Sequence, residues 1–160
     1  MKNIVFFLIF AFSFSNAQYV IEDNDISENV KEFGKQSVSY DLNHPMEFYR
    51  LQCDNAVYAQ FPGGENAFKQ KLFFYMKSDI ESSFYSVNGT FELIIFLNKS
   101  GNMQSFMCNP EVQNSHLLKR DLETALRKMN LKFTPATCNG TPIESKIRQK
   151  INFRTDNFDN

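Results

Sequence analysis

Side chains that build catalytic and metal sites are scarce in this sequence. It has two histidines, His44 and His116, and no cluster of His, Asp and Glu at ligand spacing, so we expect no metal site. No Gly-x-Ser-x-Gly elbow, Walker loop or dinucleotide fingerprint occurs, and Gly63-Gly64 alone is too short for either glycine-rich loop. The residues present therefore indicate no reaction, and we expect neither an enzyme nor a bound cofactor.

An excess of charge of one sign is also missing. The chain has 17 Lys and Arg against 18 Asp and Glu, which gives a formal net charge of −1. A near-neutral chain gives no general argument for nucleic acid or an anionic membrane as a partner. We therefore expect no nucleic acid as a partner.

The chain has a long apolar run near its N-terminus, over residues 4–14. It follows Lys2 and precedes Ser15-Asn16-Ala17, which has small residues at the two positions that a signal peptidase reads. The run is shorter than the roughly 20 residues that a bilayer span needs. We therefore expect residues 1–17 to be a cleaved signal peptide, with the protein in the periplasm or cell envelope and no stable membrane span. The alternative is an uncleaved anchor, which would make the chain a membrane-anchored subunit.

Cysteine is sparse, with Cys53, Cys108 and Cys138 only. An exported protein can form disulfides, and an odd count leaves one thiol over. No Cys-x-x-Cys spacing occurs, so neither a redox motif nor a zinc knuckle is expected. Cys108 and Cys138 are the expected pair, because each closes a predicted β element near the other. The alternative is three buried thiols that act as small hydrophobic residues.

Two helices are predicted. Phe61-Pro62-Gly63-Gly64 ends an extended stretch, since Pro62 fixes its own φ and the glycines allow a turn that side chains would prevent. Apolar residues at helical spacing then predict a helix from Glu65 to about Lys77. A second helix is predicted from Asn114 or Ser115 to Met129, and its apolar stripe is Leu118, Leu122, Ala125, Leu126 and Met129.

Three strands are predicted around the second helix. Residues 90–97 are dense in β-forming residues, a loop with Gly101 follows, and residues 103–108 return as a second strand. Residues 143–153 alternate between apolar and basic side chains, as in a strand with one buried face. The expected fold is α+β, a three-stranded antiparallel sheet with two helices packed on one face. It occupies residues 57–155, between an N-terminal arm at 18–56 that the sequence defines poorly and a frayed tail at 156–160.

Six pieces of the chain, in order, resemble the TonB C-terminal-domain family of Bacteroidetes type, over residues 57–154. They are Phe61-Pro62-Gly63-Gly64; Asn88-Gly89-Thr90 with the strand after it; Gly101; the helix at 117–129; Phe133-Thr134-Pro135-Ala136; and Asn139-Gly140-Thr141-Pro142 with the strand at 147–153. The chain departs from the family at Phe84-Tyr85-Ser86, where a Tyr-Pro pair is usual, and at Phe133, which stands for a Trp. It also lacks the membrane helix and the Pro-rich spacer of an energy transducer, since its five prolines are not clustered.

The resemblance implies a function in protein binding linked to TonB-dependent transmembrane transport. In that family the last strand is an edge strand that accepts a short extended segment of an outer-membrane receptor. The implied docking residues are Ile147, Arg148, Gln149, Lys150, Ile151 and Asn152. The predicted sheet order, second strand, first strand, third strand, also leaves the third strand exposed on one side. A homodimer is compatible with such an edge.

A rival interpretation belongs to a different class of protein. The 18 phenylalanines could line an aromatic pocket in a small exported ligand-binding protein or enzyme. A deep pocket with converging polar groups would favour that interpretation.

Overall fold

A computed structural model describes residues 31–33, 36–80, 87–111 and 115–157. The predicted signal peptide of residues 1–17, the departure at Phe84-Tyr85-Ser86 and the end of the tail lie outside these ranges. The helices are α1 Gly64–Asp79 and α2 Ser115–Met129. The strands are β1 Lys31–Phe33, β2 Gln36–Asp41, β3 Glu47–Phe48, β4 Ala56–Val57, β5 Gly89–Leu97, β6 Met103–Asn109, β7 Ala136–Cys138, β8 Thr141–Ile143 and β9 Ser145–Asn157.

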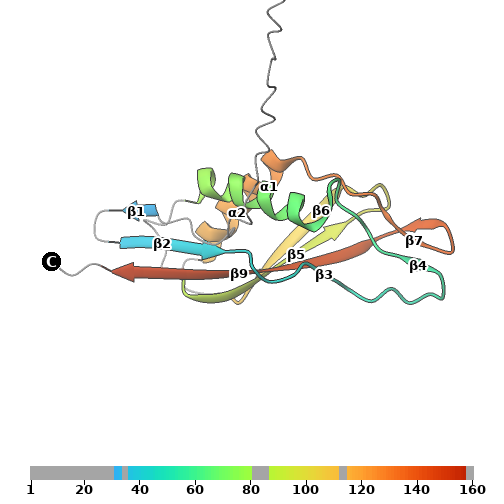
Figure 1. The fold of residues 1–160 in the computed structure, drawn as a ribbon, viewed down its shortest axis with the longest axis horizontal. Coiled ribbons are helices and arrows are strands. Elements are labelled where there is room, and N and C mark those ends of the chain that lie inside the picture. The colour runs from blue at the N-terminus through green and yellow to red at the C-terminus, as the bar shows by residue number, and fades with distance from the viewer. Residues whose placement is uncertain (1–30, 34–35, 81–86, 112–114, 158–160) are drawn as a thin grey trace, which may run out of the picture.

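Both predicted helices are confirmed, and their apolar stripes face the core. α1 begins directly after Gly63, whose φ of 84° lies in the left-handed region that glycine adopts without strain. Phe68, Leu72 and Met76 on α1 are fully buried, and the whole predicted stripe of α2 is buried as well. The helices pack on each other and lie on the same face of the sheet (Figure 1).

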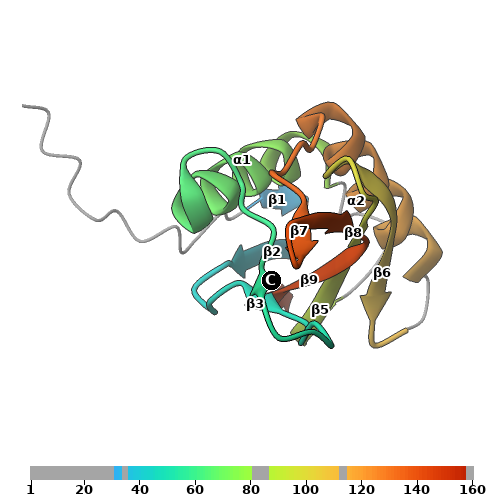
Figure 2. The same ribbon diagram turned by 90° about the vertical axis from the view of Figure 1, so that its right-hand side faces the viewer.

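The three predicted strands pair as expected, with β5 between β6 and β9 and all neighbours antiparallel. Period-2 alternation sets their faces. Phe91, Leu93 and Ile95 of β5 and Ile147 and Ile151 of β9 point at the helices and are buried. The two helices, β5 and β9 thus share one core. Figure 2 shows the same layers from the end, with β6 at the margin below α2.

The prediction of a three-stranded sheet is wrong in its number of strands. The sheet has six strands in the order β1-β2-β9-β5-β6, and β3 also pairs with β9. Residues 36–48 supply the extra partners, because β2 and β3 run antiparallel to β9 on the side away from β5. All three additional strands, β1, β2 and β3, thus lie in the stretch that the sequence defined poorly.

A second, three-stranded sheet of order β4-β7-β8 lies at one end of the molecule. Asn139 and Gly140, both at positive φ, form the tight turn between β7 and β8. The alternating stretch at 143–153 is therefore two strands, because Ile143 ends β8 and Ser145 begins β9. No helix in the part of the chain that the structure describes is long and apolar enough to cross a membrane.

Candidate functional site

The implied docking residues, 147–152, all lie in β9, which is an inner strand. On one side they pair with β5, and Gln149 lies opposite Leu93. On the other side Glu47 of β3 lies opposite Arg148, and Asp41 of β2 lies opposite Asn152. The expectation of an open edge at 147–152 is therefore wrong, because the chain's own segment 41–48 covers it.

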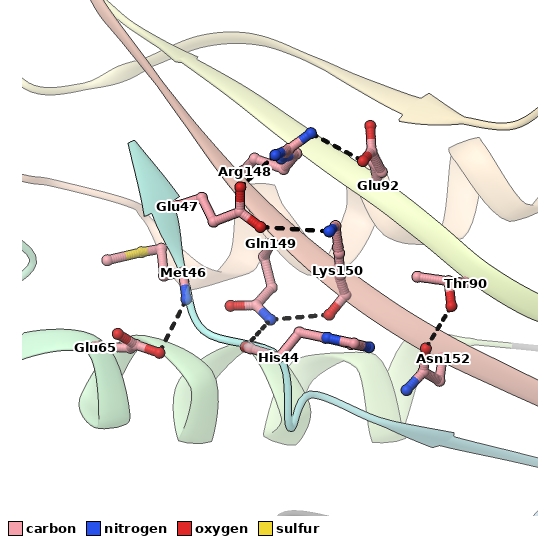
Figure 3. A network of polar contacts seen from close by, with 10 residues as sticks. All are labelled: His44, Met46, Glu47, Glu65, Thr90, Glu92, Arg148, Gln149, Lys150 and Asn152. Atoms are coloured by element: carbon pink, nitrogen blue, oxygen red, sulfur yellow. Dashed lines mark hydrogen bonds and ion pairs between the residues drawn. The ribbon is translucent and has the colours of Figure 1, made fainter. Parts of the chain in front are cut away.

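Three of the six implied docking residues have fully buried side chains. Ile147, Gln149 and Ile151 are 0% exposed. The Gln149 side-chain amide donates one hydrogen bond of 2.9 Å to the His44 carbonyl and one of 2.9 Å to the Lys150 carbonyl. The segment between β2 and β3 is therefore tied to the middle of β9 (Figure 3).

The other half, Arg148, Lys150 and Asn152, points away from the helices and is engaged by neighbouring strands. The Arg148 guanidinium forms ion pairs with Glu47 and, at 3.0 Å, with Glu92. Lys150 lies 3.4 Å from Glu47. Two of the basic side chains of β9 are thus paired with carboxylates within the fold.

Electrostatics reinforces the covering of β9. The hydrogen bond and charge of Arg148 lower the pKa of Glu47 below its ordinary value of 4.5. Glu47 is therefore ionised at neutral pH and stays paired with Arg148. Beside it, Lys146 lies 4.9 Å from the Phe96 ring centroid and 5.8 Å from that of Tyr49.

The Phe61-Pro62-Gly63-Gly64 turn also helps to hold segment 41–48, which covers β9. It places Glu65 in the first turn of α1, where its Oε1 accepts a 2.9 Å bond from the Met46 backbone N–H and lies 2.7 Å from the Lys69 ammonium. Partial burial raises the pKa of Glu65, but the bonds from Lys69 and Met46 outweigh it and lower the pKa overall. The Glu65 carboxylate thus connects the turn to segment 41–48.

The sheet ends in the three-residue strand β1 on one side and in the seven-residue strand β6 on the other. Among the described residues, β6 pairs with β5 alone. Its sequence, Met-Gln-Ser-Phe-Met-Cys-Asn, contains no charged residue and no proline. Met107 is 48% exposed and, with Ser105, lies on the face away from the helices. The predicted strand order already placed residues 103–108 at an edge, but the sequence reasoning assigned docking to the other side, although the absence of charge in 103–109 is a signal for β6.

A surface groove of about 520 Å³ lies at the Phe61-Pro62-Gly63-Gly64 turn. Phe48 and Tyr58, which are 37% and 40% exposed, line it, with their ring centroids 5.5 Å apart. Its polar lining includes Glu65, whose Oε1 is already bonded to Met46 and Lys69. The groove is open and mostly apolar, and few polar groups converge in it.

The disulfide joins Cys53 to Cys138, with Cα atoms 6.0 Å apart, and the predicted pair of Cys108 and Cys138 is wrong. The reason is topological: Cys138 ends β7, and β7 pairs with β4 near Cys53, whereas Cys108 lies in β6 of the other sheet. Cys108 is a buried thiol, and burial raises its pKa to about 11. It is therefore protonated and unreactive at neutral pH.

No group of three His, Cys, Asp or Glu side chains able to hold a metal ion occurs within the described ranges. Comparison of the chain with protein-family models, with curated proteins and with solved structures gives no match. The arrangement of the chain's own residues therefore carries the functional argument.

Proposed function

We propose that this chain is an exported, non-catalytic protein-interaction domain, similar in type to the TonB C-terminal domain. It binds an extended segment of another envelope protein, such as an outer-membrane receptor, by β-strand addition. The observation that carries the proposal is the β6 edge, which is unpaired among the described residues and has no charged side chain.

The chemistry of β6 suits strand addition. An open edge presents a row of backbone N–H and C=O groups that an incoming strand can pair with. Sheets that avoid such pairing place Lys, Pro or a bulge on the edge. Residues 103–109 contain no Lys and no Pro, and the register shift against β5 lies near the start of β6, at Gln104. On the outer face, Ser105 and Met107 lie beside Phe96 and Ile94 of β5, so an added strand would also find apolar contacts.

Photo-crosslinking tests the proposal directly. A photoreactive amino acid replaces Met107 on β6, and a control protein carries it at Phe74, which is 67% exposed on α1. In a cell-envelope extract we expect position 107 to crosslink to one continuous, extended segment of a partner, and position 74 to give no such product. Crosslinking that is equal at both positions, or absent from position 107, would overturn strand addition at β6.

A second candidate, binding of a small apolar ligand, is favoured by the groove at the Phe61-Pro62-Gly63-Gly64 turn. Such a ligand would contact the exposed rings of Phe48 and Tyr58. Titration with aromatic and aliphatic fragments, followed by backbone NMR shifts, separates the two functions. Saturable shifts that cluster at 58–65 and disappear in Tyr58→Ala would favour ligand binding, and shifts confined to other surfaces would exclude it.

A further inference from the structure

We infer that the extended segment that fits the β6 edge best is β6 of a second copy of this chain. The two sheets would then join into one continuous antiparallel sheet across a two-fold axis at Phe106. This inference rests on the proposed function, strand addition at β6, and names the occupant of that edge.

The features at the two ends of β6 define the run of residues that a second copy could pair with. At one end, Asn102 pairs with Lys132 in an antiparallel bridge, and the Phe133 N–H donates to the Gly101 carbonyl at 2.8 Å. At the other end Pro110 follows β6, and it has no N–H for a ladder. The open run is therefore Met103–Asn109, seven residues with Phe106 at the centre.

A run with this centre can pair with itself in register. In an antiparallel pair about Phe106, Ser105 faces Met107 of the second copy on the outer face. On the helix-facing side Phe106 faces Phe106 of the second copy. Gln104, which is exposed at the register shift between β5 and β6, adds no regular pair. No charged side chain faces another, and the two central rings can form an aromatic pair, which is favourable across antiparallel strands.

The distribution of charge in the sheet favours a like partner over a charged one. Four basic residues, Lys146, Arg148, Lys150 and Arg154, lie on β9, which is covered, whereas β6 has none. Charges on an edge are the usual means by which a sheet avoids pairing with its own copies. The β6 edge therefore lacks that protection.

The interface is small, which sets its expected strength. A seven-residue edge with its adjoining side chains buries less than the roughly 1,200 Å² typical of stable complexes, so the dimer is weak and depends on concentration. A weak dimer can also give way to the extended segment of another envelope protein. Self-pairing and partner binding then compete for the same edge.

Two variants at the same two positions test the register. In Ser105→Lys/Met107→Lys, each added lysine faces a lysine of the second copy. In Ser105→Lys/Met107→Glu, each lysine faces a glutamate. We expect sedimentation equilibrium to show a reversible monomer–dimer equilibrium for the unmodified protein, an affinity about tenfold or more lower for the double lysine variant, and an affinity within about threefold of the unmodified protein for the lysine–glutamate variant. Both positions are exposed or on the exposed face, and unchanged circular dichroism confirms folding.

Three results would overturn the inference: a monomer at all concentrations, a dimer that the double lysine change does not weaken, or a dimer that both variants weaken alike. Hydrogen exchange gives an independent readout, since amides in 103–109 should become protected as protein concentration rises, while those of α1 stay constant. The proposed function fails in a different experiment. Crosslinks from position 107 to another protein would uphold strand addition even if the purified protein is a monomer.

Discussion

Gln149 interrupts the inward series of β9, Ile147, Ile151 and Phe153, and it is fully buried. Its amide N–H groups bond to the His44 and Lys150 carbonyls. Its Oε1 is buried without a hydrogen-bond partner among the described residues. One polar side chain in an apolar series thus fixes the segment that closes the β9 edge.

Replacing Gln149 tests that bond. In Gln149→Leu the His44 carbonyl loses its donor, so we expect the free energy of unfolding to fall by about 1–3 kcal/mol in urea titrations. The matched control is Gln70→Leu on the exposed face of α1, where we expect a change within about 0.5 kcal/mol. Equal effects of the two substitutions would contradict a role for Gln149 in holding the cover.

The Glu47–Arg148 pair makes stability depend on pH in a known direction. The pKa of Glu47 is lower in the folded state than its ordinary value of 4.5, so its stabilising effect is present above that pH. The effect is lost as the pH falls below 4.5 and Glu47 becomes protonated. In Glu47→Gln we expect a shallower decline of stability between about pH 5 and pH 2.5, measured by denaturant titration. The exposed Glu144→Gln should keep the original pH profile, and identical profiles for all three proteins would contradict the pair's role.

Gly101 and Gly140 share a φ of 78° but differ in their surroundings. A Cβ at Gly101 would lie 1.9 Å from the Phe133 carbonyl oxygen, whereas one at Gly140 has nothing within 4 Å. Gly140→Ala should cost about 1–2 kcal/mol of stability through backbone strain alone. Gly101→Ala should cost at least about 2 kcal/mol more, because the backbone around Phe133 must move. Similar thermal denaturation of the two variants would contradict the close packing at Gly101.

At the scale of elements, the predictable parts are those whose pattern repeats. α2 has a full apolar stripe, β5 is a run of β-forming residues, and β9 alternates over most of its length. All three elements occur, although β9 begins at Ser145 and continues to Asn157, into the stretch expected to be a frayed tail. β3 has only two residues and therefore shows no period, and it is the strand that covers Ile147 and Arg148. The sequence analysis placed the docking edge on β9 because it could not predict β3, which pairs with that side of β9.

The disulfide illustrates the same limit, because its pairing depends on which strands lie side by side. β4 has two residues, so its pairing with β7, which brings Cys53 beside Cys138, has no local signal in the sequence. Cys108 lies near the end of β6 and Cys138 ends β7, but these strands belong to different sheets. Spacing along the chain therefore could not identify the pair.

Removing the disulfide should destabilise the whole domain, because it joins residues 85 positions apart. We expect Cys53→Ser/Cys138→Ser to lower the free energy of unfolding by about 2–4 kcal/mol. Cys108→Ala should keep the disulfide and lose about 1 kcal/mol from its small cavity. Thiol titration of the unreduced, denatured protein should find a single reactive thiol, at Cys108. A single thiol at Cys53 would contradict the observed connectivity.

At the scale of the whole molecule, the two sides of the β5–β9 pair differ. On the β9 side, β2, β3 and the segment between them cover the sheet and are bonded to it through Gln149, Glu47 and Glu65. On the β5 side, β6 ends the sheet among the described residues and has no charge. The other margin of this sheet, β1, has three residues and includes Lys31 and Glu32, so β6 is the longer and uncharged margin among the described residues.

Hydrogen exchange, resolved by residue in the free and partner-bound protein, tests this asymmetry most directly. In the free, dilute protein we predict slow exchange along β9 at 147–152, which is paired or covered on both sides, and fast exchange of the outward-pointing amides of β6 at 103–109. Binding of a partner should slow exchange in β6 and leave β9 unchanged. Fast exchange along 147–152 in the free protein, with protection there and not in β6 on binding, would contradict the account.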